Sequence, residues 1–194
     1  MTDAPVDRAV VVVSGLPRSG TSMMMHMLSE GGLPILTDGV READADNPHG
    51  YFEYEPVKSL KTNSDWVSNA RGKAVKVVSP LLRHLPQGFK YRVIYLRRAI
   101  REILASQACM IARRREDKGA DDAELELMYR RHLREVESHL LDDDAFRPLF
   151  VEHRRLIDYP EPEAAKIADH LGRGLDVAKM CAAVDASLYR SKFG

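Results

Sequence analysis

The sequence predicts an α/β fold in which helices cover both faces of a parallel sheet, giving three layers. Three short runs of β-branched and apolar residues, typical of strands buried on both faces, alternate with stretches of helical periodicity. Strands that alternate with helices are joined by right-handed crossovers, which makes the sheet parallel and puts helices on both of its faces. With 194 residues, the chain is long enough for one domain with a hydrophobic core, so we expect a single domain over residues 1–194.

The apolar pattern and the glycines that interrupt it place each element. Strands are expected at Ala9–Ser14, Ala74–Ser79 and Tyr91–Leu96, with a weaker fourth around Phe150. The expected helices are Thr21–Glu30, Ala99–Arg115, Ala123–Leu141, Glu163–Leu171 and Val177–Val184. Parallel sheets bind ligands beyond the carboxyl ends of their strands, so the loops after the first three strands should form one rim.

Two segments stand apart from this alternation. Residues 38–69 are polar and rich in turn residues, so we expect an excursion that crosses the rim and stays outside the core. Residues 109–147 are expected to form a helical, lid-like region.

Charge and composition exclude several classes of partner. The 29 basic and 29 acidic side chains cancel, which argues against a nucleic-acid binder that relies on a global positive field, so any anion site must be local. The N-terminal residues "MTDAPVDRAV" lack the pattern of a signal peptide, and no apolar run approaches the roughly 20 residues of a membrane span, so we expect a cytoplasmic protein without a membrane partner. Cys109 and Cys181 are too few for a disulfide framework or a structural zinc site.

The stretch "GLPRSGTSM" directly after the first strand has the glycine spacing of a phosphate-binding loop. Gly15 and Gly20 allow a tight turn in which backbone N–H groups converge on an anion at the start of a helix. In hydrolases of ATP or GTP a lysine follows the second glycine, and the next hydroxyl holds magnesium. Here Thr21 stands in the lysine position and Arg18 lies inside the loop. The loop therefore predicts a phosphate-like ligand held by an arginine, with no metal.

The string Pro17-Arg18-Ser19-Gly20-Thr21-Ser22 resembles the 5′-phosphosulfate loop of sulfotransferases that use 3′-phosphoadenosine 5′-phosphosulfate (PAPS). That family carries a lysine or an arginine at the position of Arg18. The resemblance implies a P-loop, sulfotransferase-like fold and binding of PAPS by these six residues. It also implies transfer of a sulfuryl group to a hydroxyl or amine, with 3′-phosphoadenosine 5′-phosphate (PAP) as the product.

A second anion site is predicted after the third strand, in "RRAIREILAS". The same family carries an arginine at this strand end and a serine eight residues later, and both contact the 3′-phosphate of the donor. Arg98, Glu102 and Ser106 match this pattern, although Ala99 and Ile100 replace an Asp-Pro pair. The segment "DNPHGYFE" also resembles bacterial members of the family. The resemblance therefore assigns the 3′-phosphate to Arg98 and Ser106.

Sulfuryl transfer resembles phosphoryl transfer, in which positioning and positive charge do most of the work. Arg18 is expected to supply that charge as a catalytic residue. Lys76, on the second strand, is either a second cation or a lysine that extends to solvent.

The general base is less clearly marked. Cytosolic sulfotransferases carry a histidine just after the second strand, where this chain has Val78 or Ser79, and His84 lies farther along. Our hypothesis is that Glu53, in "GYFE", is the catalytic base, with His49 as the second candidate. The alternative is that Glu53 caps a helix or forms an ion pair.

Two other functions remain open from the sequence. One is a nucleotide or small-molecule kinase of the P-loop fold, and the other is a catalytically silent module that binds PAP or PAPS. The acceptor would be a small molecule or a glycan. The aromatic residues of the excursion either line an apolar acceptor cleft or pack it against the sheet: Tyr51, Phe52, Tyr54 and Trp66. His26, on the first helix, is expected to be a packing residue.

Overall fold

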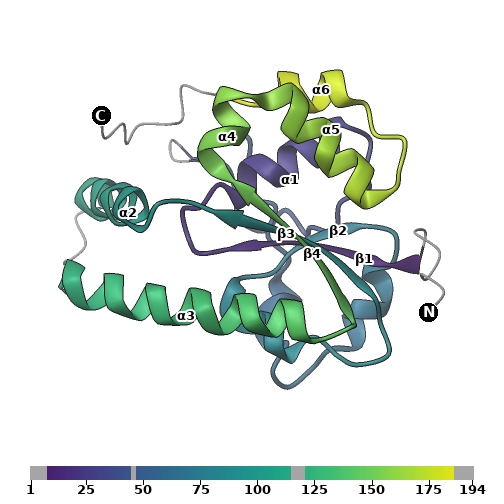
Figure 1. The fold of residues 1–194 in the computed structure, drawn as a ribbon, viewed down its shortest axis with the longest axis horizontal. Helices are drawn as coiled ribbons and strands as arrows, with labels where there is room; N and C mark the ends of the chain where they lie inside the picture. The colour runs from purple at the N-terminus through teal and green to yellow at the C-terminus, as the bar shows by residue number, and fades with distance from the viewer. Residues whose placement is uncertain (1–7, 45–46, 115–120, 186–194) are drawn as a thin grey trace.

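The computed structural model, which describes residues 8–44, 47–114 and 121–185, has a four-stranded parallel sheet at its centre (Figure 1). The strands are β1 (Val10–Gly15), β2 (Ala74–Lys76), β3 (Tyr91–Arg97) and β4 (Phe146–Glu152), in the order β2-β1-β3-β4. In the register of the sheet, Val12 lies opposite Val75 on β2 and Val93 on β3. The two inner strands, β1 and β3, are buried almost throughout, as expected for strands covered on both faces.

Helices cover both faces of the sheet. They are α1 (Thr21–Glu30), α2 (Ile100–Arg114), α3 (Asp122–Asp142), α4 (His153–Asp158), α5 (Pro160–Leu171) and α6 (Val177–Ala182). Helices α1, α4, α5 and α6 lie on one face, and α3 lies on the other (Figure 1). The predicted three-layer α/β fold is therefore confirmed. None of the helices within the described residues has the length and apolar character needed to span a membrane.

Side chains of successive residues on β1 point into two separate cores. Val10 and Val12 belong to the core beneath α3, whereas Val11 and Val13 belong to the core beneath α1 and α5. This is why the strand reads as a continuous apolar run instead of an alternating one.

The second strand is shorter than predicted. β2 ends at Lys76, although Val77 still donates its backbone N–H to the carbonyl oxygen of Val13 over 3.0 Å. A 3₁₀ helix, η4 (Ser79–His84), then begins, because Pro80 suits the first turn of a helix and cannot donate to a sheet. The expected strand over Ala74–Ser79 is thus three residues too long.

The excursion over residues 38–69 differs from its expectation in its second half. Two 3₁₀ helices, η2 (Glu55–Ser59) and η3 (Asp65–Ala70), bring apolar side chains onto the sheet. The buried ones are Val57, Leu60, Trp66 and Val67. The expectation that this segment stays outside the core is therefore wrong for this half. The chain turns in the two 3₁₀ helices, and these turns bring its few apolar side chains together against the sheet.

The predicted lid-like region, 109–147, contains the end of α2 and all of α3, while residues 115–120 lie outside the described part of the chain. The C-terminal half of α3 packs Val136 and Leu140 against the sheet. Ser79 and His132 share a hydrogen bond of 2.8 Å that joins η4 to α3.

The packing of α3 can be tested by a pair of neighbouring substitutions. Leu140 is fully buried in the core, whereas Leu141 is 67 % exposed. We expect Leu140→Ala to lower the free energy of unfolding by about 2–5 kcal/mol, because it leaves a cavity. Leu141→Ala should change it by about 0.5 kcal/mol or less. Denaturant unfolding followed by circular dichroism measures both, and equal losses in the two variants would contradict this placement of α3.

Candidate active site

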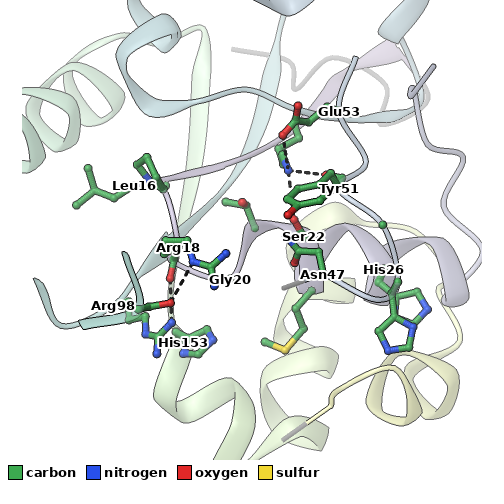
Figure 2. A pocket seen from close by; sticks show the side chains of 18 of the residues that line it. Leu16, Arg18, Gly20, Ser22, His26, Asn47, Tyr51, Glu53, Arg98 and His153 are labelled. Carbon is green, nitrogen blue, oxygen red and sulfur yellow. Dashed lines mark hydrogen bonds and ion pairs between the residues drawn. The ribbon is translucent and has the colours of Figure 1, made fainter. Parts of the chain in front are cut away.

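A cavity of about 450 Å³ opens at the carboxyl ends of the strands. Its lining includes one residue at or directly after the end of every strand: Gly15, Lys76, Arg98 and His153. The rim predicted from the alternation of strands and helices is thus the wall of a real pocket. Arg18, Arg98 and His153 lie together on one side of it, and Tyr51 and Glu53 lie on the other (Figure 2).

The loop after β1 has the backbone of a tight, phosphate-type turn. Gly15 and Gly20 have positive φ angles of 153° and 99°. A Cβ atom at Gly20 would also lie only 2.4 Å from Cδ2 of His153. Gly15 ends β1 and Gly20 directly precedes α1, whose first-turn N–H groups point toward its N-terminal end, as an anion site requires.

Three residues from the predicted anion sites are joined by hydrogen bonds. Arg18 Nε donates to Ser106 Oγ over 3.0 Å. Arg98 Nη1 donates to the carbonyl oxygen of Arg18 over 2.9 Å, and these two residues lie together in Figure 2. Arg98 Nε also donates to Glu102 over 2.9 Å, and its side chain is only 8 % exposed. The loop after β1 and helix α2 are therefore cross-linked at the pocket wall.

This arrangement explains how Arg18 keeps an unusual backbone conformation. Its φ angle is 67°, in the left-handed region that a non-glycine residue rarely adopts. The bond from Arg98 to its carbonyl oxygen holds the peptide in place. Because a serine hydroxyl that accepts a bond keeps its own proton, Ser106 can accept from Arg18 and still donate to an anion.

His153 is a pocket residue that the sequence analysis missed. It begins α4 directly after β4, is buried, and packs its imidazole against Gly20. The pKa of His153 is lowered to about 4, mainly by burial and also by the positive charge of Arg98, while Glu102 opposes both. The ring is therefore neutral at physiological pH. Its position at the carboxyl end of the fourth strand is the signal that could have identified it.

Lys76 lies at the opposite side of the loop. Its ammonium group donates to Ser22 Oγ over 3.2 Å and to the carbonyl oxygen of Tyr51. The side chain is only 10 % exposed, so the alternative that Lys76 extends to solvent is wrong. The pKa of Lys76 is lowered to about 8, mainly by burial, and the nearby Glu53 carboxylate opposes this shift. Lys76 is thus a cation directed at the first turn of α1.

Glu53 lines the pocket and forms an ion pair at the same time. Its Oε1 atom lies 2.7 Å from Nη1 of Arg41 and 3.9 Å from Nζ of Lys76. Glu53 therefore forms an ion pair, although with a loop residue and not with a helix, and its role as the catalytic base stays a prediction. We call this side of the pocket the rim half, lined by Arg41, Asn47, His49, Tyr51, Glu53 and Lys76.

The histidine candidates are distributed differently. His49 lines the pocket and stacks on His26, with ring centroids 4.4 Å apart. His26 lines it as well and packs against His49 and Phe52, as expected for a packing residue, and burial lowers its pKa. His84, at the end of η4, is not among the described residues that line the pocket.

The aromatic residues of the excursion do not form an apolar cleft. Tyr54 and Trp66 pack edge to face in the core, with centroids 5.6 Å apart, and Phe52 packs on the opposite core. Only Tyr51 of the four lines the pocket, and the guanidinium of Arg41 lies 3.3 Å from its ring centroid. The expected cleft is therefore wrong, and the alternative of packing holds for three of the four rings.

In the part of the chain that the structure describes, no cluster of three or more His, Cys, Asp and Glu side chains is placed to hold a metal ion. The positive groups at the loop are Arg18, Lys76 and Arg98. The chemistry that these described residues supply is charge stabilisation and hydrogen bonding to anions.

Comparison with solved structures identifies the same architecture in sulfotransferase domains. The sulfotransferase domain of the olefin synthase of Synechococcus PCC 7002 superposes with a TM-score of 0.58 at 15 % identity, over 97 % of this chain and 82 % of that one. The sulfotransferase domain from the curacin biosynthetic pathway gives 0.55 at 10 % identity, over 93 % and 79 %. Sulfotransferase STF9 from Mycobacterium avium gives 0.52 at 15 % identity, over 93 % and 67 %.

No protein-family model matches this chain, and no curated protein matches its sequence. The likeness therefore lies in the arrangement of the sheet and its helices. The chain has the fold of sulfotransferase domains.

Proposed function

We propose that this protein is a sulfotransferase that moves a sulfuryl group from PAPS to an acceptor. The observation that carries the proposal is the hydrogen-bonded connection of Arg18, Arg98 and Ser106, which unites a phosphate-type loop with a second cationic site. The shared fold supports it. An adenosine with anionic groups at both its 3′ and 5′ positions needs such a pair of sites, one on each side of the ribose.

The residues present fit the donor. The loop from Pro17 to Ser22, with its glycine turn and Arg18, is suited to the 5′-phosphosulfate, although the side chain of Ser19 is fully buried and does not line the pocket. Arg98 and Ser106 are suited to the 3′-phosphate, because charge-assisted bonds from a guanidinium and a hydroxyl are strong for such an oxyanion. His153, whose neutral ring packs against Gly20, would support the loop at this glycine.

In the reaction, a bond forms between the acceptor oxygen and sulfur, and the bond between sulfur and the 5′-phosphate oxygen breaks. Negative charge spreads over the sulfuryl oxygens and collects on the leaving phosphate of PAP. Arg18 and Lys76 lie on either side of the loop and would stabilise that charge. The acceptor proton would pass to the Glu53 carboxylate, which faces the pocket beside Lys76.

A P-loop kinase remains the second candidate on fold grounds. In this chain Thr21 replaces the lysine that such enzymes use against the terminal phosphates, and Arg18 provides the loop cation instead. A silent binder of PAP would share the donor site and lack transfer. A comparison of the affinities for PAP, ADP and Mg-ATP distinguishes a kinase from the other two candidates. An assay for transfer of a labelled sulfuryl group then distinguishes the sulfotransferase from the silent binder.

Ser106→Ala tests the 3′-phosphate site by calorimetry with PAP and with ADP. We expect the wild-type protein to prefer PAP, and the variant to lose about tenfold or more in PAP affinity, as for a hydrogen bond to a charged group. ADP lacks the 3′-phosphate, so its affinity should change less. Ser138→Ala, an exposed serine on α3, is the matched control. Preference of the wild-type protein for Mg-ATP over PAP would contradict the proposal.

Glu53→Gln tests the proposed base. The amide has the shape of the carboxylate but cannot take the acceptor proton, so kcat with an aliphatic hydroxyl acceptor should fall by roughly 10²- to 10⁴-fold. PAP affinity measured at about pH 6, where Lys76 stays charged without Glu53, should remain near the wild-type value, because Glu53 lies on the other side of the pocket from Arg98 (Figure 2). A near-native kcat would exclude Glu53 as the base.

Lys76 predicts a pH dependence of donor binding. Its pKa of about 8 means that it is mostly charged below that pH and neutral above it. An anion at the loop favours the charged form, so PAP affinity should fall as pH rises from about 7 to about 9, and binding near pH 8 should take up protons. Calorimetry over this range should show a shallower dependence in Lys76→Met. An equal slope in both proteins would contradict the assignment of Lys76.

A further inference from the structure

We infer that the acceptor is a hydroxyl compound rich in polar groups and without positive charge, such as a sugar, and not a phenol or an amine. The inference rests on the proposed function and concerns the rim half of the pocket. The six side chains that define the rim half all carry charged or hydrogen-bonding groups, with Tyr51 and Glu53 opposite Arg98 (Figure 2). The pocket is also lined by Met23, Pro48, Val77 and Val78.

The aromatic rings near this wall are already covered. The Arg41 guanidinium lies 3.3 Å from the centroid of Tyr51, whose hydroxyl donates to Asp44 over 2.7 Å. His26 and His49 stack on each other with an interplanar angle of 14°. A phenolic acceptor would therefore have to displace a cation to reach the face of Tyr51 that Arg41 covers.

The ion pair of Arg41 and Glu53 also disfavours an apolar acceptor. The two side chains are 39 % and 24 % exposed and both line the pocket, so water can reach the pair. An apolar group placed on the pair would remove this water and provide no hydrogen bonds in return, which is unfavourable for buried polar groups. A polyhydroxylated acceptor replaces the water, because each hydroxyl can donate to Glu53 and accept from Arg41.

The sign of the charge excludes a cationic acceptor. Glu53 Oε1 is 2.7 Å from Arg41 and 3.9 Å from Lys76, so two cations surround one carboxylate. An ammonium group approaching Glu53 would meet both at short range. The acceptor functional group is therefore a hydroxyl, carried by an uncharged or anionic molecule.

A panel of acceptors with labelled PAPS tests the inference. The probes are methyl glucoside, trehalose and glucose 6-phosphate, compared with 2-naphthol and tyramine. We expect kcat/KM for at least one sugar to exceed that for 2-naphthol by about tenfold or more, with tyramine the poorest. Preferred transfer to 2-naphthol or tyramine, or no transfer to any sugar by protein that binds PAP, overturns the inference. Failure to bind PAP would overturn the proposed function as well.

Arg41→Leu gives a sharper test on the same panel. Loss of the guanidinium uncovers the Tyr51 ring and removes the partner of Glu53. The ratio of sugar to 2-naphthol turnover should fall by about tenfold or more, while PAP affinity, which reports an intact donor site, stays the same. Arg131→Leu is the control, because Arg131 pairs with Glu135 on exposed α3 and should keep the wild-type ratio. An unchanged ratio in Arg41→Leu overturns the inference.

Discussion

One short hydrogen-bonded connection determines the geometry of the site: Arg98 donates to the carbonyl oxygen of Arg18, and Arg18 donates to Ser106. It joins the loop after β1 to helix α2 after β3, two neighbouring strands of the sheet. Because it also holds Arg18 in a left-handed conformation, the loop that could hold one anion and the wall that could hold another are built as a single unit. The other residues of the pocket lie around this unit.

The two sides of the pocket differ in the charged groups that they present. Near Arg98 the wall presents guanidinium groups, a hydroxyl and the neutral ring of His153, which is suited to polyanions. The rim half contains both signs of charge, with the Glu53 carboxylate between the two cations Arg41 and Lys76. The proposed polyanionic donor on one side and the proposed acceptor, a polar hydroxyl compound without positive charge, on the other are consistent with this difference. Lys76 lies at the boundary, where charge would develop during transfer.

Much of this fold could be predicted from local sequence, and much of the pocket from strand ends. Helix Thr21–Glu30 was placed correctly because glycines border it on both sides, and the fourth strand was the weakest prediction because Pro148 interrupts its pattern at a sheet edge. The burial of Trp66 and the stacking of Arg41 on Tyr51 depend on how a polar segment folds back, which no local pattern encodes. His153 was missed because it directly follows β4, the strand that the sequence pattern marks least clearly. The roles of Arg18, Arg98, Ser106 and Glu53 in binding and catalysis stay predictions.

The most direct measurement is a crystal structure of the protein with PAP. This account predicts that the 3′-phosphate accepts hydrogen bonds from Arg98 and from the hydroxyl of Ser106, with the 5′-phosphate in the loop from Gly15 to Ser22. A nucleotide bound with its 3′-phosphate turned to solvent, or with Arg98 directed away from it, would contradict the central claim.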